Sequence, residues 1–277
     1  MAACRSPKPL VGVRVPGGVP SYMSHYFYRM MLPHLLLTMV SAYVLVTDFH
    51  WIYIAYALAG FYLLGIFGNT IGFHRYLTHQ SFKVNKFWHN AFIVLGSMTG
   101  QGSPLSWTAL HLHHHRNSDT EKDVHSPIHG FWQSTVLWQI KGKFQDTQGF
   151  IAPRALYKDK LVRLIHDHYY KLYWAVGLLL LLVDTYLFLF FFCLGGYTLM
   201  FFMDNISNFT FHTNKFGYTN YETRDNSRNV PWISYITLGA GWHNNHHKFP
   251  ARYRFGEPNE IDIGARIIEL IRADGAH

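Results

Sequence analysis

The chain has 277 residues, of which 49% are hydrophobic and only 14% are charged, well below the roughly one quarter that is typical of soluble domains. The formal net charge is +8, but the basic residues are spaced as in a membrane protein, so we expect no nucleic-acid partner. The two cysteines, Cys4 and Cys193, lie far apart in sequence, which argues against a disulfide framework and a thiolate metal site.

Lysine and arginine are absent from two long stretches of the chain. One lies between Arg29 and Arg75 and the other between Lys171 and Lys215. Each stretch can hold two membrane-spanning helices of about 20 residues. Because basic residues mark the cytoplasmic side of spanning helices, we expect both termini and the central segment to be cytoplasmic.

The predicted fold is therefore an all-α integral membrane protein with four transmembrane helices in two hairpins and a cytosolic histidine-rich cap. The alternative is a soluble protein with two buried helical hairpins, which the leucine run after Gly177 disfavours. The expected segments are a cytosolic lead-in (1–30), a first hairpin (31–73), a cytosolic segment (74–171), a second hairpin (172–212) and a cytosolic C-terminal segment (213–277).

The apolar runs place the individual helices in chain order. Residues 1–20 have no apolar run and predict a disordered lead-in rather than a signal peptide. The polar residues 47–50 and the pair Gly195-Gly196 are expected to form the two far-side turns. An amphipathic helix should precede the second hairpin, and another should end the chain. The expected helices span 31–46, 51–73, 159–170, 172–193, 197–212 and 261–271.

Three histidine clusters stand out among the 19 histidines. In the second and third clusters, histidines at positions i, i+3 and i+4 share one face of a helix. His113 points to the opposite side and should not be a ligand. In the first cluster the offset is five residues, so either the helix ends between the two histidines or each serves a different metal. The candidate ligands are His74 and His79; His111, His114 and His115; and His243, His246 and His247.

A ninth candidate is His212, at the cytoplasmic end of the last spanning helix, with Asn208 one turn earlier on the same face. Imidazole suits zinc, copper, iron and nickel. Nine imidazoles exceed what one tetrahedral zinc needs, and they predict two metals of coordination number five or six.

These motifs resemble those of the membrane fatty acyl desaturases of the delta-9 type. The stretch from His74 to Phe82 resembles the first histidine box of that family, and His111 to Ser118 resembles the second. The stretch from Gly241 to Pro250 is similar to the third almost residue by residue. The resemblance covers about residues 67–250. It implies a four-helix membrane bundle whose cytosolic cap holds two ferrous ions, with His212 as ninth ligand and Asn208 holding a metal-bound water.

The resemblance also implies the reaction, in which O2 is consumed and a cis double bond is inserted at the delta-9 position of a saturated acyl chain. Unactivated methylenes offer no acidic proton or leaving group, so the metals carry the difficult step. A hydroxylase of the same di-iron superfamily is an alternative with the same ligands. A membrane metal transporter is a more remote one.

The chain departs from the family pattern at two places. Leu112 replaces an arginine of the second box. Ala109 and Leu110 replace the Arg-Asp pair that animal acyl-CoA desaturases use on the nucleotide headgroup, which leaves a lipid-linked acyl chain or a carrier-protein thioester as substrates. No His-Pro-Gly-Gly stretch of a fused cytochrome b5 is present, so a separate electron donor such as cytochrome b5 or ferredoxin is expected.

Carboxylates that accept a ring N–H would orient the ligand imidazoles and offset the charge of the metals. The nearby acidic loop and the last spanning helix supply the candidates. Ionisable groups inside a membrane are functional by default, but Asp184, near the middle of the third predicted helix, has no assigned role. The candidates are Asp119, Glu121, Asp123 and Asp204.

Overall fold

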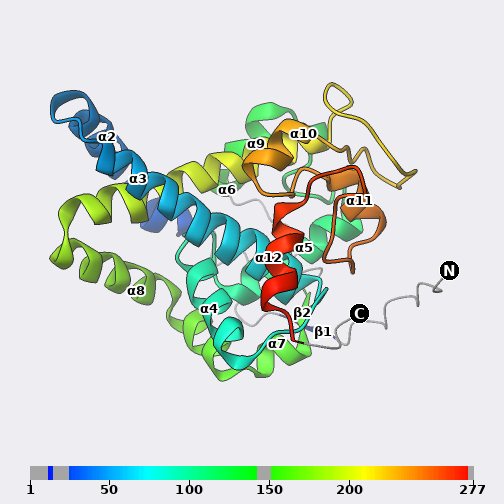
Figure 1. Ribbon diagram of the computed structural model, residues 1–277, viewed down its shortest axis with the longest axis horizontal. Coiled ribbons are helices and arrows are strands. Elements are labelled where there is room, and N and C mark those ends of the chain that lie inside the picture. Colours follow the sequence, from blue (N-terminus) through cyan, green and yellow to red (C-terminus); the bar gives the residue numbers. More distant parts are fainter. Residues whose placement is uncertain (1–11, 15–24, 142–150, 274–277) are drawn as a thin grey trace.

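The computed structural model describes residues 12–14, 25–141 and 151–273, and it is mostly helical (Figure 1). In Figure 1, helices α2, α3 and α8 project to the left. Toward the right lie α5 (Pro104–Asn117), α11 (His243–Lys248) and α12 (Ile263–Ile271). The short elements of the cap are η3 (Pro127–His129), η4 (Gln133–Leu137), α6 (Trp138–Lys141), α7 (Arg154–Lys158) and α10 (Pro231–Ile236).

The first two predicted helices agree closely with the structure. Helix η1 (Phe27–Met31) continues into α2 (Leu32–Thr47), and α3 (Trp51–Gly60) continues into η2 (Phe61–Thr78). The second of these helices runs five residues beyond its predicted end, so His74 lies inside it and His79 caps it. The amide of His79 donates to the carbonyl of His74 over 3.1 Å, which is the i to i+5 hydrogen bond of a π-helix.

The boundaries predicted for the second hairpin are wrong. Helix α8 (Lys160–Val183) absorbs the amphipathic segment predicted at 159–170, with a kink at His168, and it ends ten residues before the predicted end at Cys193. The chain turns at Asp184 and re-enters a helix formed by η6 (Leu187–Leu199) and α9 (Met200–Phe211). Asp184 has extended backbone angles, and its carboxylate accepts from the amide of Leu187 at 2.6 Å, as an N-terminal cap does.

Gly195 and Gly196 therefore lie inside a helix and not in a turn. A β-carbon on Gly195 would collide with the carbonyl oxygen of Ala57, and one on Gly60 would collide with that of Phe191. Small residues at such positions allow the backbones of membrane helices to approach closely. The glycine pair serves the packing of η6 against α3.

Among the described residues, three helices are long and apolar enough to cross a membrane, namely Phe27–Thr47, Trp51–Thr78 and Leu187–Phe211. Leu35, Met39 and Val46 on the first of them are exposed, as is expected of side chains that face lipid. Helix α8 does not meet the same criterion, because charged residues occupy its first half. The structure thus supports three of the four expected spans.

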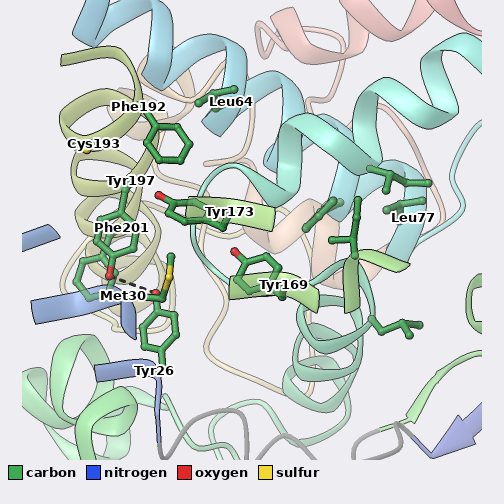
Figure 2. Packing of buried hydrophobic residues seen from close by; sticks show 14 of the residues in the cluster. Tyr26, Met30, Leu64, Leu77, Tyr169, Tyr173, Phe192, Cys193, Tyr197 and Phe201 are labelled. Carbon is green, nitrogen blue, oxygen red and sulfur yellow. Dashed lines mark hydrogen bonds between the residues drawn. The ribbon is translucent and has the colours of Figure 1, made fainter. Parts of the chain in front are cut away.

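A buried aromatic cluster joins the spanning helices to the segment that precedes them (Figure 2). The hydroxyl groups of Tyr26 and Tyr197 lie 3.3 Å apart, and Tyr173 of α8 packs on Phe192 of η6 with ring centroids at 4.7 Å. Met30 is fully buried in the same cluster. This core fixes α8 against η6.

A buried ion pair joins the C-terminal part of the cap to helix η2. Arg75 of η2 donates to the carboxylate of Asp262 at 3.1 Å, and both side chains are 0% exposed. Asp262 also caps α12 (Ile263–Ile271), because it accepts from the amide of Ala265 at 2.9 Å. Because Asp262 is the N-cap, α12 begins at Ile263, two residues after the predicted start.

A pair of short strands departs from the all-α expectation. Strand β1 (Gly12–Arg14) pairs antiparallel with β2 (Ile151–Pro153). Apart from β1, the lead-in predicted at 1–20 lies outside the described residues.

Candidate metal centre

The structure brings the nine candidate histidines together in two groups. The first group holds five imidazoles, and the second holds four. In each group the candidate ligand nitrogens all lie within 4.8 Å of one another. The contributing elements are η2, α5 (Pro104–Asn117), the end of α9 and α11 (His243–Lys248).

The first group is formed by His74, His79, His111, His115 and His246. The Nε2 atoms of His74 and His246 are 2.9 Å apart, and those of His79 and His111 are 3.1 Å apart. The π-helical winding explains why His74 and His79 meet, since the i to i+5 hydrogen bond places them one turn apart. Of the two alternatives for this pair, the structure agrees with the first. The helix ends at Thr78, between the two histidines, and both rings join one group.

The second group is formed by His114, His212, His243 and His247. The Nε2 atoms of His212 and His243 lie 3.0 Å apart. Each histidine triplet is thus divided between the groups. On α5, the neighbours His114 and His115 belong to different groups, and on α11 the same is true of His246 and His247.

His113 belongs to neither group, as the helical geometry predicts. Its Nε2 lies 2.8 Å from the carbonyl oxygen of Lys122. The ring therefore points to the loop that follows α5 and not to the other imidazoles.

Carboxylates hold three of the four imidazoles of the second group by their Nδ1 atoms. Asp123 lies 2.8 Å from His114 and Asp119 lies 3.1 Å from His212, as the predicted candidates would require. The third imidazole, that of His247, lies 2.6 Å from Asp225. A carboxylate on Nδ1 leaves Nε2 unprotonated and directed to the centre of the group.

The two other candidate carboxylates do not contact the imidazoles. Glu121 is 87% exposed and lies 3.7 Å from His129, at the surface of the loop. Asp204 is within the last spanning helix, where it accepts from the amide of Asn69 at 3.2 Å. Their predicted role as partners of ligand histidines is not supported by this geometry.

Two residues of the site have no counterpart among the predicted ones. Asp225 lies 22 positions before its partner His247, and no helical spacing connects them. His125 follows Asp123 by two residues, its Nδ1 lies 3.6 Å from that carboxylate, and its ring stacks on His114 at 4.8 Å. The Asp-x-His spacing at Asp123 is a sequence signal from which His125 could have been predicted.

The donor set fits metal ions. The Nε2 atoms of His114 and His247 are buried and have no hydrogen-bond partner among the described residues. A buried nitrogen without a partner is costly, and a metal ion would satisfy it. Neutral imidazole is a ligand for transition metals, and all nine donors of the two groups are imidazoles.

Burial favours the neutral form of several of these imidazoles. It lowers the pKa of His79 to about 3 and, with the neighbouring His212, that of His247 to about 4. The pKa values of His115 and His246 are lowered by burial and then by nearby imidazoles. For His114 burial is outweighed by Asp123, which raises the pKa. The neutral rings offer lone pairs to a metal at neutral pH.

A cavity of about 180 Å³ lies against one side of the two groups. His74 and His111 of the first group line it, as do His114 and His243 of the second. Apolar side chains such as Trp107, Leu110, Trp138 and Phe211 form part of its wall. The cavity can present one small segment of a ligand to both groups at once.

Asn208 lines this cavity one turn before His212. Its amide nitrogen donates to the carbonyl oxygen of His125 at 2.9 Å. The hydrogen bond fixes the side chain beside the second group.

Comparisons with known proteins agree with this geometry. The family model for fatty acid desaturases matches residues 49–256. The sn-1 stearoyl-lipid 9-desaturase of Anabaena variabilis is 33% identical over 237 residues, which are 83% of this chain and 84% of the relative. Delta-9 acyl-lipid desaturase 1 of Arabidopsis thaliana is 33% identical, over 77% of this chain and 70% of its own. The icosanoyl-CoA 5-desaturase of Limnanthes douglasii is 34% identical, over 82% of this chain and 65% of its own.

Proposed function

Because this chain belongs to the fatty acid desaturase family and is an oxygen-dependent oxidoreductase, we propose that it inserts a cis double bond at the delta-9 position of a lipid-linked acyl chain. The observation that carries the proposal is the convergence of nine imidazoles in two groups beside one cavity. The delta-9 position is supported by the third histidine box and by relatives named as 9-desaturases.

The proposed cofactor is a pair of ferrous ions, one in each group of histidines. When bound, the ions supply the redox chemistry that couples the reduction of O2 to the removal of two hydrogen atoms from neighbouring methylenes. The nine imidazoles hold the ions, and Asp119, Asp123 and Asp225 orient three of those rings. Asn208 is proposed to hold a water molecule at the second group.

The protein's own task is to position the acyl chain. An unactivated methylene has no polar group that could form a hydrogen bond, so its position relative to the metals depends on the shape of the cavity. Trp107 and Phe211 line that cavity beside His111 and His243. These side chains are proposed to align adjacent carbons with the two groups and to exclude bulk water.

A lipid-linked substrate is supported by the residues that precede the second histidine box. Ala109 is 0% exposed and offers no charged group to a nucleotide. Of the three relatives described above, two are named as lipid desaturases and the third as an acyl-CoA desaturase. The expected preference can be measured by supplying a stearoyl lipid and stearoyl-CoA to the same purified enzyme.

We also propose the complete topology of four spans with both termini and the histidine cap in the cytoplasm. Its support is that Leu178, Leu179 and Leu182, on the second half of α8, are exposed like lipid-facing side chains. The basic residues lie outside the apolar stretches. A glycosylation site inserted beside Asp48 should be modified in microsomes, and one beside Ala273 should not.

Expression in a host that lacks its own desaturase tests the function. Wild-type protein should produce a new monounsaturated fatty acid with the double bond at carbon 9. His114→Ala should abolish it, because His114 supplies an unpartnered buried nitrogen to the second group. His50→Ala is the control, since this exposed histidine lies at the far-side turn. A hydroxylated product, or the same product from His114→Ala, would contradict the proposal.

A further inference from the structure

A groove of about 460 Å³ opens beside the histidine groups, separate from the acyl cavity. It is lined by His115 of the first group and His247 of the second. The cavity and the groove have no lining residue in common. The metal centre therefore has one side that faces the cavity and another that faces the groove.

The two imidazoles at the base of the groove stack on each other. The ring centroids of His115 and His247 are 4.3 Å apart, and their planes differ by 28°. Each ring belongs to a different group of candidate ligands. With a metal ion bound in each group, the imidazole of His115 would link the groove to one ion and that of His247 would link it to the other.

Three exposed basic side chains line the same groove. They are Arg116, which follows His115, Lys248, which follows His247, and Arg224 of the loop between α9 and α10. Glu222 and Asp225 are the two acidic residues of the lining, and the carboxylate of Asp225 is bound to His247 at 2.6 Å. The exposed charge of the groove is positive.

The proposed reaction requires a source of electrons. Reduction of one O2 to two waters takes four electrons and four protons, and the two C–H bonds that break supply two of each. The other two electrons come one at a time from a reduced carrier, and two protons come from solvent. The inference that follows concerns the site where that carrier docks, and it rests on the proposed function.

We propose that this groove is the docking site of an acidic one-electron carrier protein, which reduces the metals through His115 and His247. Opposite charges on the two partners increase the rate of encounter and fix the orientation of the complex. A phosphate-bearing lipid headgroup fits less well, because the groove is separate from the cavity that takes the acyl chain.

The test is stopped-flow oxidation of a reduced carrier by the iron-loaded, full-length protein in detergent. The probe is the soluble domain of cytochrome b5 or a ferredoxin, whichever reduces the wild-type protein. Arg224→Glu should lower the second-order rate constant about tenfold at low ionic strength and flatten its salt dependence. Arg163→Glu, an exposed arginine on α8 outside the groove, should leave both unchanged.

Two controls separate docking from other effects. A small-molecule reductant should reduce Arg224→Glu and wild type at the same rate. If Arg224→Glu were reduced more slowly by both the carrier and the small molecule, the defect would lie at the metals and the proposal would be overturned. If Arg224→Glu were reduced by the carrier at the wild-type rate, the proposal would also be overturned. If the same variant in addition had a raised KM for the lipid, the groove would be assigned to a lipid headgroup. A wild-type enzyme that is reduced but forms no unsaturated product would refute the desaturase function and not the docking site.

Discussion

At the scale of single residues, the orientation of each imidazole depends on a carboxylate behind it. Asp123 is 0% exposed and lies 2.8 Å from Nδ1 of His114, so the ring can only direct Nε2 inward. Although burial acts in the opposite direction, the nearby His125 and His114 hold the pKa of the Asp123 carboxyl well below its usual range. The carboxylate therefore stays charged and can offset the charge of a metal bound by His114.

Asp123→Asn should weaken metal binding by roughly 10- to 100-fold, because partners of ligand histidines typically contribute that much. Competition against a chelator, with iron counted per chain, would measure the loss. Glu121→Gln is the matched control in the same loop, since Glu121 is 87% exposed and contacts no candidate ligand. Equal affinities for the two variants would show that Asp123 does not orient His114.

At the scale of secondary-structure elements, glycine determines how closely two spanning helices pack. Gly195→Ala should destabilise the protein by about 1–3 kcal/mol, because the added methyl group meets the backbone carbonyl of Ala57, which cannot rotate away. Gly65→Ala is the comparison, since its methyl group meets the flexible side chain of Met200. Thermal unfolding in detergent should therefore give a clearly lower midpoint for Gly195→Ala. Equal midpoints would contradict the packing argument.

The turn between α8 and η6 can be tested through its cap. Asp184→Ala should cost about 1 kcal/mol of stability, because it removes the acceptor of the Leu187 amide. Asp184→Asn should restore most of that loss, since an asparagine caps equally well. The same thermal measurement would count against a capping role if both substitutions had the same effect.

Helix boundaries were predictable where a polar break interrupts an apolar run. The break at 47–50 is visible in the sequence, and helix α2 indeed ends at Thr47. In the second hairpin there are two possible breaks, and the sequence predicts the turn at the glycine pair although Asp184 forms it. The reason is tertiary, because Gly195 is required by its neighbour Ala57, and no pattern within the segment reveals that contact.

At the scale of the whole molecule, the histidines connect parts of the chain that are otherwise separate. Chelation of the metals should lower the thermal midpoint by about 5–10 °C, because a ligand that binds only the folded state stabilises it. Ferrous iron should restore the midpoint, and magnesium should not, since it prefers oxygen ligands. An apoprotein as stable as the loaded protein would mean that the four elements are held in place without metal.

The convergence of the nine candidate histidines could be expected from the sequence, but their division into two groups could not. The separation of His114 from His115 depends on how α11 and the end of α9 approach α5, and only the assembled fold determines that. The role of Asp225 was unpredictable for the same reason, since its partner His247 lies on another element. Shared faces within one helix were thus predictable, whereas the exact pairing of side chains from different elements was not.

The placement of adjacent residues on α5 in different groups has a consequence for assembly. An ion bound at His115 would restrain the backbone that also carries His114, and α11 would impose the same coupling through His246 and His247. The second ion then meets a partly ordered site and loses less conformational entropy on binding. Iron uptake by the empty protein should therefore be cooperative, with few chains that carry a single ion at half saturation.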